Sequence, residues 1–421
     1  MFKFSYFFKI ILVFICICSF FSFSYADDIM PEEDDFDISS YLNSDIEASS
    51  NSSEFPTINS RAYVVIDRKS STVLVGKNEY AKKKMASTTK IMTSLIIIEN
   101  CNLSDTVTIS KKASNTGGSR LGLKTGDKIT VHDLLYGLML RSGNDAAVAL
   151  AEYTSGSIPE FANLMNKKAE ELGLTNTHFV TPHGLDQDEH YTTAYELALL
   201  TNYALNNSKF CQIVGSKTYT ITINGYPRTL TNTNELLGVL DGVYGVKTGF
   251  TNGANRCLVT SCKRGDMDII CVVLGADTKK FRTQDSIKLI NYSFSNFSYI
   301  NISEIIDDEF NKWKDNNCQK FNVYKGISNN VELYYTKPSS EFIPVKRDLQ
   351  NKIHVYVSCN FKQNAPLLKD NKIGNISIYV DTQLQYTLDI LVKNTVKKKN
   401  IFDYLYDFCF NFKYCFNGLF K

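Results

Sequence analysis

Residues Met85–Leu95, M-A-S-T-T-K-I-M-T-S-L, are the stretch of this 421-residue chain around which we expect the fold to be organised. Ser87 and Lys90 are three positions apart, and the run of apolar residues after them is typical of a buried helix. On a helix that opens at Ser87, both side chains lie on one face. A serine becomes a nucleophile when a base takes its proton, and a lysine in a dry pocket can be that base. The alternative is a helix cap beside a solvated lysine.

The N-terminal part of the chain indicates an exported protein. Residues 1–26 combine early lysines, a short apolar segment and a small-x-small site before Asp27, the pattern of a signal peptide, with an uncleaved membrane anchor as the alternative. Residues 27–56 are rich in Asp, Glu, Ser and Asn, which predicts a disordered acidic linker.

Composition excludes several classes of function. The formal net charge of +2 gives no reason to expect nucleic-acid binding. Nine of the eleven cysteines follow residue 26, and an odd number without C-x-x-C pairs predicts neither a disulfide framework nor a zinc site. We expect no metal and no cofactor.

The pattern from residue 57 to residue 298 predicts an α+β domain. A β-hairpin from Arg61 to Lys77 is followed by helices, and from Thr218 the pattern changes to strands, with a closing helix at about 283–294. We expect the first strands to join the last strands in one antiparallel sheet.

Two further segments complete the chain. Residues 299–395 contain short alternating strands separated by polar turns, which predict a small all-β domain. Residues 396–421 begin with three lysines and continue as an aromatic-rich helix in which Asp403, Asp407 and Asn411 recur every four positions. Such a helix is too polar to span a bilayer, so we expect it to anchor the protein by lying in a membrane surface. Packing on the protein's own surface is the alternative.

Two more short motifs accompany Ser87 and Lys90. Ser142-Gly143-Asn144 lies in a turn between two predicted helices, and Lys247-Thr248-Gly249 lies at the end of a predicted strand. A second Lys-Thr-Gly, at 124–126, lies between turn signals and precedes the Ser-Gly-Asn turn. Each motif is weak alone, but the three in this order and setting are a strong signal.

With these motifs the chain resembles the penicillin-binding serine D-alanyl-D-alanine carboxypeptidases of peptidase family S11, low-molecular-mass penicillin-binding proteins that trim peptidoglycan stem peptides. The resemblance extends from about Arg61 through residue 395. It includes F-A-N-L-M-N-K-K-A-E-E-L-G-L-T-N-T-H-F (161–179), P-H-G-L-D-Q-D-E-H-Y-T-T-A (182–194) and A-P-L-L-K-D-N-K-I-G (365–374).

The resemblance implies a penicillin-binding/β-lactamase-like transpeptidase domain over residues 57–298, and a location on the outer face of a bacterial cell membrane. The implied partners are a stem peptide ending in D-Ala-D-Ala as substrate, β-lactams as covalent inhibitors, and the membrane surface.

The catalytic residues that we expect are Ser87, Lys90 and Ser142. Ser87 would attack the carbonyl of the penultimate D-alanine and form an acyl-enzyme. Lys90, its charge disfavoured by burial and by Lys247, would be the base, and Ser142 would relay the proton to the leaving amine.

The remaining site residues would bind the substrate. Asn144 would hold the substrate's amide, with Lys90 as a further possible partner, and the resemblance implies an oxyanion hole from the backbone N–H groups of Ser87 and Phe250. Arg282 lies where the family places an arginine for the terminal carboxylate, although a surface ion pair at a helix start is the alternative. The predicted binding set is Asn144, Lys247, Thr248, Gly249, Phe250 and Arg282.

Other functions are less well supported by the sequence. His183 and His190 lack a third metal ligand of defined spacing, and we expect both to brace their loop. Glu196 receives no role. No G-x-S-x-G elbow is present.

Two further classes of protein share part of this pattern. A serine β-lactamase would need an E-x-x-L-N segment between Ser142 and Lys247, which the chain lacks, and the β domain and tail also argue against it. A wall-binding protein without turnover would need none of the intact motif residues.

Overall fold

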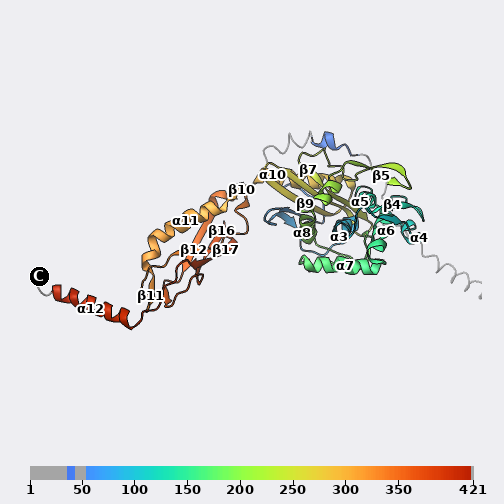
Figure 1. Ribbon diagram of the computed structural model, residues 1–421. Helices are drawn as coiled ribbons and strands as arrows, with labels where there is room; N and C mark the ends of the chain where they lie inside the picture. The colour runs from blue at the N-terminus through green and yellow to red at the C-terminus, as the bar shows by residue number, and fades with distance from the viewer. Residues whose placement is uncertain (1–35, 43–53, 419–421) are drawn as a thin grey trace, which may run out of the picture. The chain divides into compact units, whose positions relative to one another are not determined.

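The computed structural model describes residues 36–42 and 54–418 (Figure 1). The predicted signal peptide and most of the predicted acidic linker lie outside these residues. The chain divides into two compact units. The larger includes Val75–Arg264 and Ile269–Ile290, and the smaller comprises Asp67–Leu74, Gly265–Asp268 and the chain from Asn291 onward. Each unit is described by itself below.

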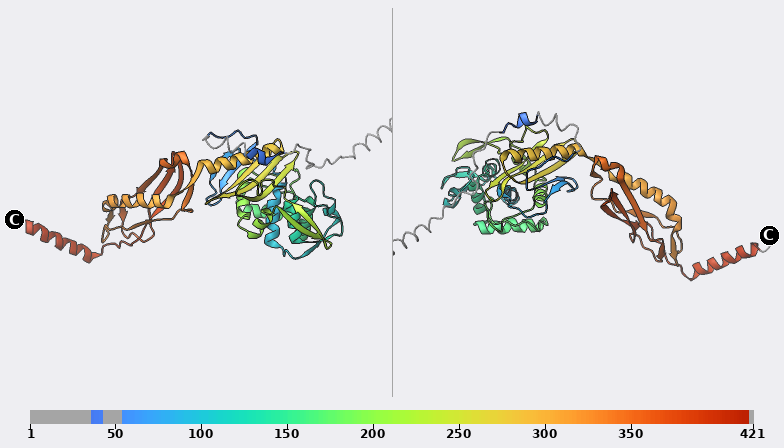
Figure 2. Two further views of the ribbon diagram at one scale, coloured as in Figure 1. Left: turned by 90° about the horizontal axis from the view of Figure 1, so that it is seen from above. Right: turned by 180° about the vertical axis from the view of Figure 1, so that it is seen from behind.

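A five-stranded sheet is the centre of the larger unit, with strand order β2-β1-β9-β8-β7. Its strands are β1 (Ala62–Asp67), β2 (Val73–Lys77), β7 (Val243–Thr251), β8 (Asn255–Arg264) and β9 (Met267–Ala276). The predicted joining of the first and last strands in one sheet is therefore confirmed. Most residues of β8 and β9 are buried, because helices cover both faces of the sheet (Figures 1 and 2).

Helix α10 (Lys279–Asn296) follows β9 and begins four residues before the helix predicted at about 283–294. The Thr278 hydroxyl accepts a hydrogen bond from the backbone N–H of Phe281 at 3.1 Å, which satisfies a donor at the helix start. The earlier start places both Lys279 and Arg282 on the first turns of α10.

Helix α3 (Lys90–Asn100) lies at the centre of the helical layer, where it packs against helices α5 to α9. Eight of its eleven residues are buried, as the apolar run predicted. It is preceded by a 3₁₀ turn, η1 (Ala86–Thr89), so the predicted helix opening at Ser87 is a tighter turn that continues into α3. The surrounding helices are α5 (Val131–Leu140), α6 (Asn144–Ser155), α7 (Ile158–Glu171), α8 (Ala194–Ala204) and α9 (Ser208–Val214).

Side-chain caps define where several of these helices start. Thr130 accepts from the backbone N–H of Asp133 and so caps the start of α5, and the Asp133 carboxylate accepts from the backbone N–H of Thr222. Between α3 and α5 the chain forms two short paired strands and a single helical turn. These are β3 (Thr106–Thr108), α4 (Lys111–Ser114) and β4 (Lys128–Thr130), and a separate hairpin is formed by β5 (Thr218–Ile223) and β6 (Tyr226–Thr231).

The smaller unit is built around a four-stranded sheet, order β12-β17-β16-β14. The strands of the whole unit are β10 (Phe297–Asn301), β11 (Asn322–Tyr324), β12 (Leu333–Tyr335), β13 (Phe342–Lys346), β14 (Ile353–Cys359), β15 (Lys362–Asn364), β16 (Lys372–Val380) and β17 (Gln383–Val392). Two short 3₁₀ turns, η2 (Cys318–Lys320) and η3 (Arg347–Lys352), also belong to it. One helix, α11 (Ile302–Asn317), contributes Ile302, Ile306 and Phe310 to the core of this predicted β domain. Helix α12 (Ile401–Gly418) ends the described chain.

Candidate active site

The Ser87 hydroxyl lies in η1, directly beside the Lys90 amine. The Lys90 Nζ atom is 2.7 Å from Ser87 Oγ, 2.7 Å from Asn144 Oδ1 and 2.8 Å from the carbonyl oxygen of His183. Both Ser87 and Lys90 are buried, Lys90 completely. The alternative of a solvated lysine beside a helix cap is therefore wrong for this chain.

The backbone around Ser87 is held in an uncommon conformation. Ala86, which precedes the serine, has a positive φ of 48°, and Ser142 has a positive φ of 58°. Non-glycine residues adopt such angles at a cost, and they are frequent at functional sites. Gly249 on β7 approaches η1 so closely that a Cβ atom there would lie 3.2 Å from the backbone nitrogens of Ser87 and Thr88.

The Ser142-Gly143-Asn144 motif connects α5 to α6, as predicted. The Asn144 side chain donates from Nδ2 to the carbonyl of Gly117 at 2.9 Å, and this bond orients Oδ1 toward Lys90. Next to it, the Asp145 carboxylate accepts backbone N–H groups from three consecutive residues, Leu121, Gly122 and Leu123, at 2.7–3.0 Å. The 117–123 segment is thus tied to the start of α6.

The Lys247-Thr248-Gly249 motif lies inside β7 and not at its end, because the strand continues to Thr251. The Lys247 amine is buried and donates to the carbonyl of Thr248 at 3.0 Å. Burial lowers the pKa of Lys247 well below its usual value, and the charges of Lys90 and Arg282 lower it further. The Thr248 hydroxyl is 2.7 Å from the hydroxyl of Thr233.

An open cavity of about 500 Å³ brings the three motifs together. It is lined by Ser87, Ser119, Arg120, Arg141, Ser142, Asn232, Thr233, Glu235, Thr248, Gly249, Phe250, Arg256, Lys279 and Arg282. Six of the nine predicted site residues thus line one cavity, while Lys90, Asn144 and Lys247 are fully or almost fully buried. The second Lys-Thr-Gly contributes no residue to the lining: its Thr125 hydroxyl is 2.7 Å from the hydroxyl of Ser114.

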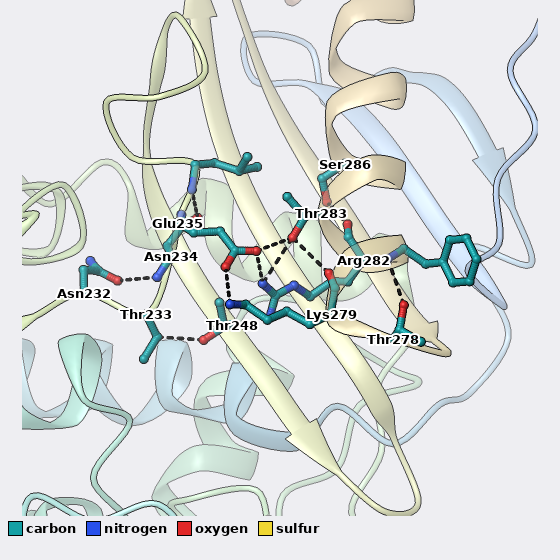
Figure 3. A network of polar contacts seen from close by, with 12 residues as sticks. Asn232, Thr233, Asn234, Glu235, Thr248, Thr278, Lys279, Arg282, Thr283 and Ser286 are labelled. Carbon is teal, nitrogen blue, oxygen red and sulfur yellow. Dashed lines mark hydrogen bonds and ion pairs between the residues drawn. The ribbon is translucent and has the colours of Figure 1, made fainter. Parts of the chain in front are cut away.

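Arg282 reaches this cavity from the first turns of α10. Its Nη2 atom is 2.7 Å from Oε1 of Glu235, in the loop after β6, so Arg282 does form an ion pair (Figure 3). The alternative of a surface pair is nevertheless wrong, because the Arg282 side chain is only 5% exposed. Arg256, on β8, stacks its guanidinium over the Phe250 ring at 4.0 Å from the ring centroid.

His183 and His190 hold the loop behind the nucleophile, as predicted. His190 Nδ1 accepts the backbone N–H of Val180 at 2.9 Å, so Nε2 carries the proton and donates to the Thr89 hydroxyl, 2.8 Å away in η1. Burial lowers the pKa of both imidazoles to about 3, with a further contribution from the Lys90 charge. Gly184 in the same loop has a φ of 91°, and a Cβ atom there would overlap the carbonyl oxygen of Ala86.

A family model for D-alanyl-D-alanine carboxypeptidases, peptidase S11, matches residues 49–278, more than half of the chain. The chain belongs to this family. A second model, the C-terminal domain of penicillin-binding protein 5, matches residues 313–398. The expectations of family, fold class, enzyme class and function are confirmed: the chain is a serine-type D-alanyl-D-alanine carboxypeptidase of cell-wall biogenesis.

Individual carboxypeptidases match over most of their length. The D-alanyl-D-alanine carboxypeptidase DacF of Bacillus subtilis is 34% identical over 351 residues, which cover 82% of this chain and 88% of the relative. Among solved structures, penicillin-binding protein 5 of Haemophilus influenzae is 29% identical with a TM-score of 0.66, covering 82% of this chain and 100% of that chain. A Streptomyces DD-transpeptidase is 36% identical with a TM-score of 0.55, covering 57% of this chain and 99% of that chain.

Several residues of this carboxypeptidase site were not found from the sequence. Asp145, His183 through its carbonyl, Glu235 and Lys279 all contact predicted site residues or the segments that hold them. Only Asp145 had a local signal, since it directly follows the Ser-Gly-Asn motif. Glu196, to which no role was assigned, accepts the backbone N–H of Asn176 and the hydroxyl of Thr177, which is a structural role in the adjoining turn.

Proposed function

We propose that this carboxypeptidase removes the terminal D-alanine from peptidoglycan stem peptides through an acyl-enzyme on Ser87. The observation that carries this proposal is the set of contacts of Lys90 Nζ. A neutral amine has two N–H groups and one lone pair. Asn144 Oδ1 and the His183 carbonyl only accept hydrogen bonds, so they take the two N–H groups. In the neutral form of Lys90, the lone pair then faces Ser87 Oγ, 2.7 Å away, which is the geometry of a base that can take the hydroxyl proton.

Acylation then follows from the residues around Ser87. As Oγ attacks the carbonyl carbon of the penultimate D-alanine, its proton passes to Lys90 and a tetrahedral oxyanion forms. Collapse of this intermediate breaks the peptide bond, and the leaving amine takes a proton that Ser142 relays from Lys90. Water hydrolyses the resulting ester and regenerates Ser87. The backbone N–H groups of Ser87 and Phe250 are proposed to hold the oxyanion, where loss of one donor typically costs ~3–4 kcal/mol.

The other end of the cavity is proposed to hold the terminal carboxylate. Thr248 and Arg282 line the cavity, and the buried Lys247 directly precedes Thr248 on β7. Gly249 lets β7 approach η1, and Asn144 is proposed to hold the substrate's amide. Five cationic side chains and one carboxylate are among the residues that line the cavity, which suits an anionic ligand. β-Lactams, which carry both an acyl group and a carboxylate, are expected to acylate Ser87.

The proposed roles are tested with Ser87→Ala and Lys90→Gln. D-alanine release from a diacyl-D-Ala-D-Ala peptide and formation of a labelled penicillin adduct are measured for each purified protein. We expect no adduct in Ser87→Ala and a loss of at least about 10³-fold in acylation rate in Lys90→Gln, because the general base is removed. D-alanine release by Ser87→Ala would disprove the mechanism. Rapid penicillin hydrolysis by the wild type would instead indicate a β-lactamase.

We also propose that the protein is exported and works at the outer face of the cell membrane. Residues 1–26 support export through their signal-peptide pattern. Helix α12 supports surface attachment, because its described apolar side chains are exposed and three lysines precede it. No helix among the described residues is long and apolar enough to cross a bilayer. The proposed domains are 57–298 for catalysis, 299–395 for the β domain and 396–421 for the anchor.

A further inference from the structure

Glu235 places a carboxylate at the end of the cavity that is proposed to bind the substrate's own carboxylate. Glu235 belongs to the loop after β6. Of the charged residues that line the cavity, five are cationic and Glu235 is the one anion. Its two side-chain oxygens contact different cations: Oε1 lies 2.7 Å from Arg282 Nη2, and Oε2 lies 3.0 Å from Lys279 Nζ (Figure 3). Glu235 therefore bridges two positive charges.

The bridge is held from one side by α10. Lys279, Arg282 and Thr283 lie on its first turns, and the Thr283 hydroxyl also donates to Oε1 of Glu235. Arg282 donates to Oε1 of Glu235 through Nη2. The three contacts keep Glu235 anchored even if one of them is given up.

Charge explains why a counter-ion is needed here. Arg282 is buried, and a buried cation without a partner is strongly destabilising. Burial alone would raise the pKa of Glu235, but Arg282, Thr283 and Lys279 together hold it below the usual value, so Glu235 is an anion at neutral pH. Glu235 supplies this negative charge to Arg282.

We propose that Glu235 is a specificity-determining residue that competes with the terminal carboxylate of the substrate for Arg282, an inference that rests on the proposed function. On binding, the substrate carboxylate takes Arg282, while Glu235 remains paired with Lys279 and Thr283. Two cations then neutralise two carboxylates. Lys279 acts through Glu235, as a positioning residue that retains the displaced carboxylate. The arrangement selects ligands whose free carboxylate binds Arg282 strongly enough to displace Glu235.

A double-mutant cycle tests this exchange. KM and kcat for a diacyl-D-Ala-D-Ala peptide are measured for wild type, Glu235→Gln, Lys279→Gln and the double variant. We expect Glu235→Gln to lower KM by about three- to tenfold with little change in kcat, because a like charge near the substrate carboxylate is removed. Lys279→Gln should raise KM by about threefold when Glu235 is present, because Glu235 then remains paired with Arg282. In the Glu235→Gln background, Lys279→Gln should not change KM.

A peptide ending in D-alaninamide is the matched control, because it lacks the terminal carboxylate. Its inhibition constant should be the same for all four proteins, and each protein should form a stoichiometric penicillin adduct, which shows that the site is intact.

Four outcomes would overturn the inference. A higher KM in Glu235→Gln would mean that Glu235 only orients Arg282, and an equal effect of Lys279→Gln in both backgrounds would mean that Lys279 attracts the substrate directly. Tighter binding of the amide peptide by Glu235→Gln would mean a general change of the cavity. A wild type that neither releases D-alanine nor forms an adduct would overturn the proposed function, and this inference with it.

Discussion

At the scale of single residues, the site concentrates positive charge that burial makes costly. Lys247 is buried, its pKa is lowered first by burial and then by Lys90, and the repulsion between the two lysines acts on both. Removing the charge at position 247 should therefore make protonation of Lys90 easier. A base that is protonated more easily stays inactive up to a higher pH.

Lys247→Gln tests this coupling. We expect the acidic limb of the pH dependence of penicillin acylation to move to higher pH by about one unit, because one like charge is removed beside the base. The second-order rate constant for acylation is measured from pH 5 to pH 10. Lys263→Gln, an exposed lysine on the neighbouring strand β8, is the control and should keep the wild-type profile. An unshifted profile in Lys247→Gln would contradict the coupling.

The site residues that were predicted and those that were missed differ in sequence separation, the number of positions between each residue and its contact partner. Ser87 and Lys90 are one helical turn apart, so their contact follows from local geometry. Glu235 and Arg282 are 47 positions apart, and Lys90 and the His183 carbonyl are 93 apart. Such contacts depend on how β7, α10 and the 182–193 loop pack, and neither a glutamate in a turn nor a backbone carbonyl has a motif that marks it.

At the scale of elements, the loop that contains both histidines supports η1 and should make folding stability pH-dependent. The pKa of His183 and of His190 is about 3 in the folded protein, against an ordinary value of 6.5. Below pH 6.5 the unfolded chain binds protons that the folded chain does not, so stability falls as the pH falls. The stability is fully present above pH 6.5 and decreases from there toward pH 3.

His190→Gln separates one of these titrations. Urea unfolding at fixed ionic strength should show that the wild type loses on the order of 2 kcal/mol per imidazole between pH 6 and pH 4.5. The variant should start about 1–3 kcal/mol less stable, because the bonds to Val180 and Thr89 are weakened. It should then lose less stability on acidification. Parallel losses in wild type and variant would show that His190 does not titrate in this range.

Element boundaries were predicted well where a regular apolar pattern marks them, as for the hairpin from Arg61 to Lys77, whose strands are β1 and β2. The start of α10 was missed because the polar residues Lys279, Lys280 and Arg282 hide the helical period in the sequence. In the structure those polar side chains are used by the site, since two of them bind Glu235. The polar residues that the site uses thus replace the apolar period from which the start of α10 could have been predicted.

At the scale of the whole molecule, the remaining prediction concerns attachment to a membrane. Helix α12 exposes Ile401, Phe402, Leu405 and Phe408, and Lys397 to Lys399 precede it. Asp403 and Asp407 are four positions apart, so they lie together on the side of the helix opposite to these apolar residues. Aromatic burial at the lipid interface, with about 1 kcal/mol from each lysine near anionic lipid, should give reversible surface binding.

Co-sedimentation with vesicles of anionic and of zwitterionic lipid measures this binding. The full chain should bind anionic vesicles better, and less so in high salt, because part of the attraction is electrostatic. Leu405→Glu, which places a charge at the centre of the apolar face, should weaken binding at least about tenfold, while D-alanine release from a soluble peptide stays at the wild-type rate. A chain ending at Asn400 keeps the backbone bond between Val396 and Leu367 and should not sediment with vesicles. Equal sedimentation of this shortened chain and the full chain would show that α12 is not the anchor.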